Sequence, residues 1–252
     1  MKSRNHIEIV GHNHLMTLRN CGGYYSCPKD ADGKRLGPLV GYAGKYMDVN
    51  GPLQWVGDIY ANFAKAEIHP TVLEHFARHL GSKFNATIEL DNVDYFCAAP
   101  IGGYSLGVAL SLRTNIPMIK AEKKVLAVAT PTSREKSTLV FGRHNIEPGS
   151  TYVIVEDVCN NFSTTEELIG LIIAAGGIVL GIVCFLNRSL VVEDSYTSAI
   201  ANANIPVVSL VRLPIKEYRH DNPEVQDDVK NGNVIWKPKD EWDRLMLAMN
   251  QT

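Results

Sequence analysis

The chain has 252 residues, 45% of them hydrophobic and 21% charged, and its formal net charge is −2. Such values are typical of one globular domain with an appended subdomain, and they argue against general nucleic-acid binding and a polybasic membrane surface. The apolar runs stop well short of the roughly 20 residues of a membrane span, the N-terminus lacks the apolar stretch of a signal peptide, and five cysteines are an odd number for a disulfide framework. We therefore expect a cytoplasmic protein.

The first third of the chain contains two segments that differ in composition and periodicity. Residues 1–55 are rich in Gly, Tyr, Lys and Asp, which predicts irregular or short-stranded structure. Residues 57–84 have a helical pattern that Pro70 interrupts.

Residues 88–211 alternate apolar runs with helical patterns. This alternation predicts βαβ crossovers and an α/β fold with a mostly parallel sheet flanked by helices. Residues 122–150 lack a helical period and are expected to form an excursion or hairpin, and the polar tail closes with an amphipathic stretch. The predicted strands are 93–99, 116–121, 152–155, 178–186 and 206–211, and the predicted helices are 104–113, 164–175 and 195–202.

The loop after the strand at 152–155 carries the most chemistry. Glu156 and Asp157 end the strand, and Ser163 and Glu166 have the spacing of a capping box, which predicts a helix starting just after Ser163. The first N–H groups of that helix would face the loop and form an anion site. Carboxylates beside an anion site suit a ligand that carries hydroxyls and a phosphate, with Mg²⁺ between them. On spacing alone, a solvated acidic turn before a capped helix is an equally good interpretation.

Two more loops are expected at the same edge, because ligands of open parallel sheets bind beyond the carboxyl ends of the strands. Residues 97–103 include Gly102 and Gly103, which let a backbone approach a ligand closely, although such a pair often forms only a tight turn. Arg188 follows the strand at 178–186 and suits a carboxylate or imide group, with a surface arginine as the alternative.

Taken together, these segments resemble the type I phosphoribosyltransferases and, within them, the orotate phosphoribosyltransferase branch. Residues 153–164 resemble the family's hydrophobic strand, acid pair and phosphate loop, and residues 98–103 resemble its pyrophosphate loop. Residues 120–124 resemble the basic segment that opens its mobile catalytic loop, and Asn187-Arg188 resembles the pair whose Arg holds the edge of the base.

The resemblance implies a division of the chain and a reaction. Residues 1–55 would form a hood that recognises the base, 56–212 a phosphoribosyltransferase core with a mobile loop or hairpin at 122–150, and 213–252 a C-terminal extension. The reaction would transfer phosphoribose from phosphoribosyl diphosphate (PRPP) to a pyrimidine-like base, orotate first, with Mg²⁺ and release of pyrophosphate. The family also implies a homodimer.

The resemblance assigns roles to particular residues. Glu156 and Asp157 would hold the ribose hydroxyls and orient the metal through PRPP, and Asp157 would also be catalytic. Lys123 and Lys124 would offset charge on the leaving group. The 5-phosphate would be held by Asn160, Asn161, Ser163 and Thr164, the pyrophosphate by Pro100, Ile101, Gly102 and Gly103, and the base by Arg188, Tyr46 and Lys45.

Two departures from the family pattern bear on catalysis. Asn160-Asn161-Phe162 stands where the family usually has Thr-Thr-Gly, and Phe162 does not easily adopt the positive φ that Gly supplies. Either the loop takes another path or the phosphate site is altered. Glu122 stands where the orotate enzymes usually carry Arg, which weakens the pyrophosphate clamp. A second function therefore stays open, that of a non-catalytic sensor that binds PRPP or a nucleotide.

The N-terminal zone holds the densest set of soft metal ligands, which are His12, His14, Cys21 and Cys27. Two His and two Cys could bind zinc tetrahedrally. The Cys-x5-Cys spacing is wider than the usual gap, so we favour a hood segment with free thiols, and the sequence leaves the metal open.

Overall fold

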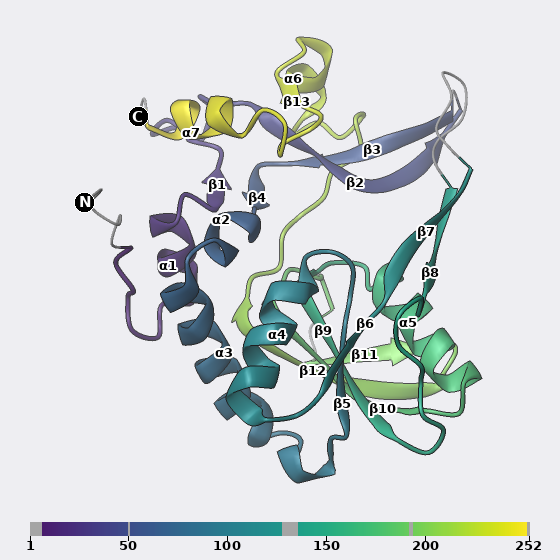
Figure 1. Cartoon of the computed structure of the whole chain (residues 1–252). Coiled ribbons are helices and arrows are strands. Elements are labelled where there is room, and N and C mark those ends of the chain that lie inside the picture. The colour runs from purple at the N-terminus through teal and green to yellow at the C-terminus, as the bar shows by residue number, and fades with distance from the viewer. Residues whose placement is uncertain (1–6, 50, 128–135, 192–193, 251–252) are drawn as a thin grey trace. The chain divides into compact units, whose positions relative to one another are not determined.

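The computed structural model describes residues 7–49, 51–127, 136–191 and 194–250 (Figure 1). They form two compact units, which we describe separately. One unit comprises residues 67–214, and the other comprises residues 1–66 together with 215–252. The expected hood at residues 1–55 and nearly all of the expected C-terminal extension thus lie in one unit.

A six-stranded sheet lies at the centre of residues 67–214. Its strands are β5 (Tyr95–Ala98), β6 (Met118–Lys120), β9 (Thr151–Cys159), β10 (Ile178–Asn187), β11 (Ser195–Ser198) and β12 (Ala203–Arg212). Their order is β11-β12-β10-β9-β5-β6. All neighbours are parallel except β11, which pairs antiparallel with β12 at one edge. The predicted α/β fold with a mostly parallel sheet is confirmed.

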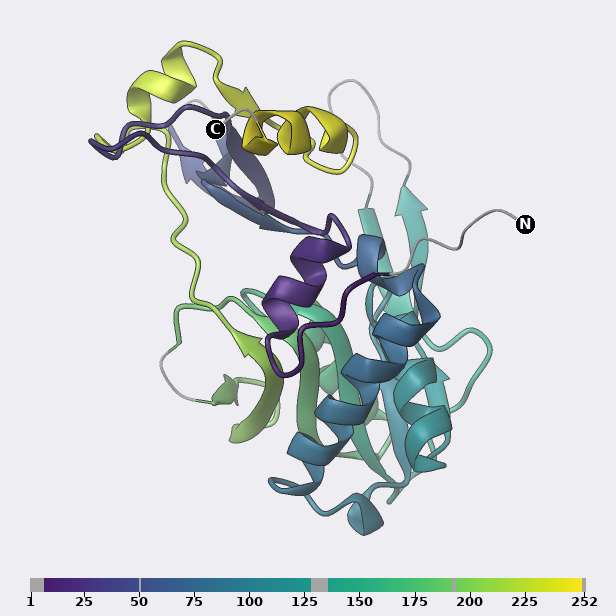
Figure 2. The same cartoon turned by 90° about the vertical axis from the view of Figure 1, so that its left-hand side faces the viewer.

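Helices cover both faces of this sheet (Figures 1 and 2). They are α3 (Pro70–Asn85), α4 (Gly103–Thr114) and α5 (Ser163–Ala174), and a short 3₁₀ turn spans Leu90–Asn92. Phe185 of β10 packs on Phe76 of α3, with ring centroids 4.6 Å apart. The preceding Cys184 clusters with Leu168 of α5 instead. Because successive strand residues face opposite sides, β10 is buried between α3 on one face and α5 on the other.

An antiparallel hairpin of β7 (Glu122–Ala127) and β8 (Lys136–Val140) extends beyond the sheet (Figure 1). Both strands lie within residues 122–150, for which a mobile loop or hairpin was expected. Glu167 of α5 fastens its second strand, because one carboxylate oxygen accepts from the Leu139 N–H at 2.7 Å and from the Thr138 hydroxyl at 3.1 Å.

The other unit joins both ends of the chain. Its elements are α1 (His14–Asn20), β1 (Tyr24–Ser26), β2 (Leu39–Asp48), β3 (Gly51–Gly57), β4 (Ile59–Ala61), α2 (Ala64–Glu67, which runs one residue past the boundary), α6 (Gln226–Lys230), β13 (Val234–Ile235) and α7 (Trp242–Asn250). Strand β2 pairs antiparallel with β3 and parallel with β13. The indole N–H of Trp242 donates to the Gly22 carbonyl at 2.9 Å. These long-range contacts explain why the two terminal segments form one body.

Some predicted elements are wrong. The helical pattern at 57–84 is a strand end, a short strand and two helices, and Pro70 begins α3 rather than interrupting it, because a first-turn proline forfeits no helical hydrogen bond. The predicted helix at 195–202 contains strand β11, whose Tyr and Thr favour strands and which gains a pairing partner in β12. Within the described residues, no helix is long and apolar enough to cross a lipid bilayer.

Candidate active site

The acid pair lies near the carboxyl end of β9, inside the strand rather than just beyond it. Glu156 is only 8% exposed, and its carboxylate accepts from the Asp157 N–H at 3.3 Å. Asp157 is partly exposed, and one of its oxygens accepts from the Val158 N–H at 2.9 Å. Burial raises the pKa of Glu156 well above its ordinary value of 4.5, and the charge of Asp157 raises it further. Glu156 thus lies at a buried strand end, and the solvated acidic turn is not what the chain forms.

The loop at residues 100–103 lies directly against this acid pair. The Ala99 N–H donates to the Val155 carbonyl at 2.9 Å. A Cβ built on Gly103 would stand 2.2 Å from that same carbonyl oxygen, and one built on Gly102 would stand 2.2 Å from Cγ of Asp157. The two glycines thus allow this loop to pack against the end of β9 more closely than a residue with a Cβ would permit. The peptide bond between Pro100 and Ile101 is cis.

The loop after β9 keeps the backbone conformation that a glycine would supply. Phe162 has φ 57° and ψ 16°, in the left-handed region. The loop therefore does not avoid the positive φ by taking another path, and Phe162 adopts a backbone conformation that its Cβ disfavours. The predicted capping box between Ser163 and Glu166 is wrong, because α5 already begins at Ser163. The Ser163 N–H donates to the Asn161 side-chain oxygen at 3.2 Å. Glu166 accepts from the Ile200 N–H at 2.9 Å instead of bonding back to the helix start.

The residues expected to bind the 5-phosphate line one small cavity. Phe162 is 4% exposed, and its ring stacks on Tyr196. A cavity of about 80 Å³ remains along the loop, lined by Glu156, Val158, Cys159, Asn160, Asn161, Phe162, Ser163, Thr164 and Thr165. The first amides of α5 point to this loop, as helix geometry requires. The predicted anion-binding residues are therefore together, with Glu156 at their border.

Arg188 follows β10 at the same edge of the sheet. Its backbone N–H donates to the Cys159 carbonyl at 2.9 Å, which ties the third loop to the end of β9. Arg188 is only 7% exposed, so it is not a surface arginine. Asn187 accepts from the Ser189 N–H at 3.1 Å and from the Ser189 hydroxyl at 2.8 Å, which shapes the turn.

The two lysines that were expected to be catalytic lie on the hairpin. Lys123 and Lys124 belong to β7 and are exposed. Within the described part of the chain, no hydrogen bond or ion pair joins either lysine to Glu156 or Asp157. Glu122, the departure from the family pattern, forms an ion pair with Arg143 at 3.1 Å.

Tyr46 and Lys45 lie on β2, in the unit formed by the chain ends. Lys45 is exposed. The Tyr46 hydroxyl accepts from the backbone N–H of His220 at 2.8 Å. The ring centroids of Tyr46 and Trp55 lie 4.8 Å apart, and the Arg219 guanidinium lies 4.6 Å from the Tyr46 centroid. Sequence reasoning missed these C-terminal partners, because no local pattern signals a contact across 174 residues.

The structure brings together the two histidines of the soft-ligand set but not its two cysteines. Ring nitrogens of His12 and His14 lie within 4.8 Å of each other, close enough to share a metal ion. The Cys27 thiol is buried and donates to the Gly37 carbonyl at 3.1 Å. Within the residues described, neither Cys21 nor Cys27 belongs to a group of side chains placed to hold a metal.

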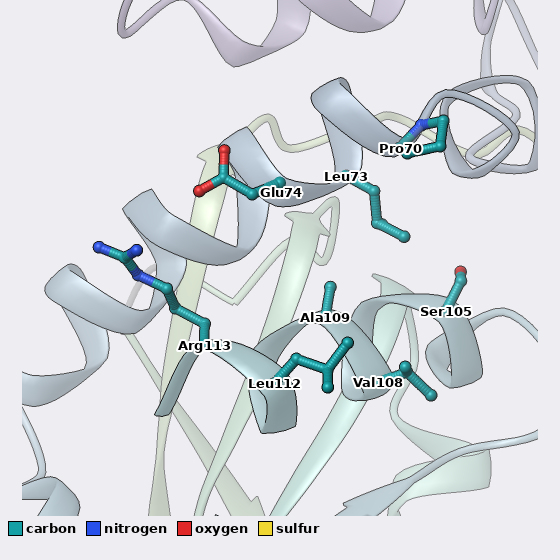
Figure 3. Close-up of a pocket in the computed structure, with 8 residues that line it drawn as sticks. All are labelled: Pro70, Leu73, Glu74, Ser105, Val108, Ala109, Leu112 and Arg113. Carbon is teal, nitrogen blue, oxygen red and sulfur yellow. The ribbon is translucent and has the colours of Figure 1, made fainter. Parts of the chain in front are cut away.

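A separate groove of about 410 Å³ lies between α3 and α4 (Figure 3). Its lining is mostly apolar, and Leu73 of α3 points toward the side chains of α4. None of the acid-pair or loop residues described above lines it. The lining residues are Pro70, Leu73, Glu74, Ser105, Val108, Ala109, Leu112 and Arg113.

Comparisons with known proteins agree with this geometry. No family model matches the chain. The orotate phosphoribosyltransferase of Bartonella henselae is 26% identical over 162 residues, which are 64% of this chain and 74% of that protein. A hypoxanthine/guanine phosphoribosyltransferase of Methanohalobium evestigatum is 27% identical over 60% of this chain and 76% of its own length. HGPRTase-like protein 3 of Haloterrigena turkmenica is 31% identical over 60% of this chain and 77% of its own length.

A solved structure supports the same fold. UMP synthase of Leishmania donovani matches with a TM-score of 0.51 and 14% identity, covering 97% of this chain and 43% of that one. The fold and the arrangement of the loops define a phosphoribosyltransferase-type α/β protein. The chain belongs to the type I phosphoribosyltransferase family.

Proposed function

We propose that the protein transfers the phosphoribosyl group of PRPP to a nucleobase, with orotate as the first candidate. A ring nitrogen of the base gives an electron pair to C1 of the ribose while the bond from C1 to the pyrophosphate oxygen breaks. Pyrophosphate leaves with the bonding electrons, and the nitrogen releases its proton. The observation that supports this proposal most is the contact of the acid pair with the loop at 100–103, at the same sheet edge as the start of α5.

The acid pair would hold the ribose. Glu156 would hydrogen-bond to one hydroxyl, and the carboxylate of Asp157 would accept from the other. The 5-phosphate lies in the small cavity and accepts from the first amides of α5, with Asn160, Asn161, Ser163 and Thr164 around it. Pyrophosphate would lie along Pro100, Ile101, Gly102 and Gly103, whose two glycines bring this loop against Asp157 and the end of β9.

The acid pair also suits Mg²⁺, which prefers oxygen ligands. Glu156 is buried, and Asp157 lies against the backbone of Gly102 with no side chain between them. We therefore assign to Glu156 and Asp157 an indirect contact through the oxygens of PRPP. When bound, Mg²⁺ neutralises charge on the pyrophosphate oxygens.

The family resemblance assigns the remaining contacts. Lys123 and Lys124 approach the leaving pyrophosphate and offset its charge. Arg188, Tyr46 and Lys45 hold the base, and the buried Arg188 offers the fork geometry that a carboxylate or imide edge needs. The relatives bear the names of both orotate and hypoxanthine/guanine enzymes, so the choice of orotate rests on the resemblance of the motifs.

A second function is favoured by one observation. Glu122 and its partner Arg143 place an acid where the orotate enzymes carry a basic residue of the pyrophosphate clamp. The alternative is a non-catalytic sensor that binds PRPP or a nucleotide without turnover.

The test is release of pyrophosphate from PRPP with Mg²⁺ and a panel of orotate, uracil, adenine, hypoxanthine and guanine. We expect turnover with orotate that falls at least about a hundredfold in Asp157→Asn, because that carboxylate acts on the developing charge. Asp91→Asn, at an exposed position of the 3₁₀ turn, is the matched control and keeps wild-type turnover. PRPP binding without turnover would identify the protein as a sensor. Turnover with a purine would replace orotate as the proposed base. Absence of PRPP binding would contradict both functions. Light scattering of the same sample tests the proposed dimer.

A further inference from the structure

Phe162 occupies a backbone conformation that its side chain disfavours. Its φ of 57° and ψ of 16° lie in the left-handed region, which residues with a Cβ enter rarely. The position immediately precedes α5 and belongs to the loop that lines the small cavity. Such a conformation persists only where the surroundings hold it in place.

Tyr196 supplies that restraint from another part of the sheet. The rings of Phe162 and Tyr196 stack with centroids 4.5 Å apart and planes 23° apart. Tyr196 belongs to β11, where it pairs with Ile205 of the adjacent strand β12. The stack therefore joins the loop to the edge strand of the sheet.

A second contact fastens α5 to the turn after β11. Glu166 accepts from the Ile200 N–H at 2.9 Å, and its own N–H donates to the Phe162 carbonyl at 2.7 Å. Partial burial acts to raise the pKa of Glu166, but hydrogen bonding from Ile200 and from the Ser198 and Tyr196 hydroxyls outweighs it and lowers the pKa. Glu166 thus stays ionised and keeps β11 beside the first turn of the helix.

We propose that Tyr196 is a positioning residue for the phosphate loop, because its stack on Phe162 holds residues 160–163 in the conformation that receives a sugar 5-phosphate. Tyr196 acts through Phe162 and does not touch the ligand. In the usual family pattern a glycine at this position adopts the positive φ unaided. Here the stack of Phe162 on Tyr196 stabilises the same backbone conformation. This inference rests on the proposed function, since it requires a 5-phosphate at the start of α5.

The first measurement compares two ligands that use different loops. In Tyr196→Leu, we expect the Kd of ribose 5-phosphate and of PRPP to rise about tenfold, the factor that corresponds to losing one aromatic pair. The Kd of pyrophosphate with Mg²⁺ stays within about twofold, because its proposed binding residues 100–103 follow another strand, β5. Tyr196→Phe keeps the ring and restores tight binding. Titration calorimetry measures all of these with the full chain and needs no turnover.

The second measurement removes the need for the stack. Glycine adopts a positive φ unaided, so in a Phe162→Gly background Tyr196→Leu no longer weakens binding of ribose 5-phosphate. If Phe162→Gly does not fold, Phe162→Asn serves instead, because Asn also tolerates the left-handed region. Tyr95→Leu is the matched control: Tyr95 stacks on Tyr152 at 5.3 Å in the same unit, and its loss lowers stability without changing the Kd of ribose 5-phosphate.

The outcomes separate this inference from the proposed function. If the wild-type protein binds PRPP but Tyr196→Leu binds ribose 5-phosphate normally, or weakens its binding equally in the glycine background, the positioning role is wrong and the function stands. An equal loss in Tyr95→Leu also overturns it, because the effect is then general destabilisation. If the wild-type protein binds neither PRPP nor ribose 5-phosphate, the proposed function fails and this inference fails with it.

Discussion

The two loops beside Glu156 reach their positions by opposite means. At residues 100–103 the close approach depends on missing side chains, since a Cβ on Gly103 would collide with the Val155 carbonyl. At residues 160–163 the unusual backbone conformation belongs to a large residue, Phe162, whose buried ring is held by Tyr196.

This difference teaches where each loop is vulnerable. The loop at residues 100–103 should be disrupted by an added side-chain atom, because its close-packed neighbours leave no room for one. The loop at residues 160–163 should be disrupted by removal of the Tyr196 ring. The predictions below test the first loop by addition, as the variants of Tyr196 test the second by removal.

The largest effect is expected for Gly103→Ala. The new Cβ would lie 2.2 Å from the Val155 carbonyl oxygen and 3.3 Å from Cα of Glu156, and both neighbours are backbone. We expect a loss of about 1–3 kcal/mol in the free energy of unfolding, measured by urea denaturation, as for other overpacked sites. The control is Gly81→Ala in α3, where the new Cβ meets side chains at 3.9 Å and should stabilise the helix by about 0.5–1 kcal/mol. Equal stability of Gly103→Ala and the wild type would show that this loop is not tightly packed.

Gly102→Ala should affect binding more than stability. Its Cβ would stand 2.2 Å from Cγ of Asp157 and 2.3 Å from both carboxylate oxygens, and a side chain can rotate away. We expect the free energy of unfolding to fall by less than in Gly103→Ala. Displacing Asp157 should weaken PRPP about tenfold, as for the loss of a hydrogen bond to a charged group. Tight PRPP binding by this variant would remove Asp157 from the ribose site.

The sequence predicted the sheet of residues 67–214 well because its signals are local. Apolar runs bounded by turn residues correspond to β5, β6, β9, β10 and β12, and the acid pair and the glycine loop lie at the expected edge. The terminal unit was not predictable in this way. Strand β13 pairs with β2 near the other end of the chain, and Tyr46 binds His220 across 174 residues. No periodicity records such a partner.

The same distinction applies within the site. The helix after the acid pair was predicted from its apolar pattern, but its capping was not, because Glu166 bonds to Ile200 rather than back to the helix start. The left-handed Phe162 was judged unfavourable from its residue type alone. The ring of Tyr196 that supports it comes from a segment predicted to be helical.

Glu156 borders both loops, and Glu156→Gln should give the smallest change, with a defined pH dependence. The pKa of Glu156 is raised in the folded protein by burial and by the charge of Asp157, so its protonated form stabilises the fold. That contribution is complete below its ordinary pKa of 4.5 and is lost as the pH rises through the higher folded value. Gln keeps the shape without ionising. We therefore expect equal melting temperatures near pH 4.5 and a higher one for the variant at pH 8, measured by thermal denaturation. Glu89→Gln, at an exposed position, should follow the wild type at every pH. A variant less stable than the wild type at pH 8 would mean that the ionised carboxylate is held by partners, and Glu156 would then be available to the metal directly.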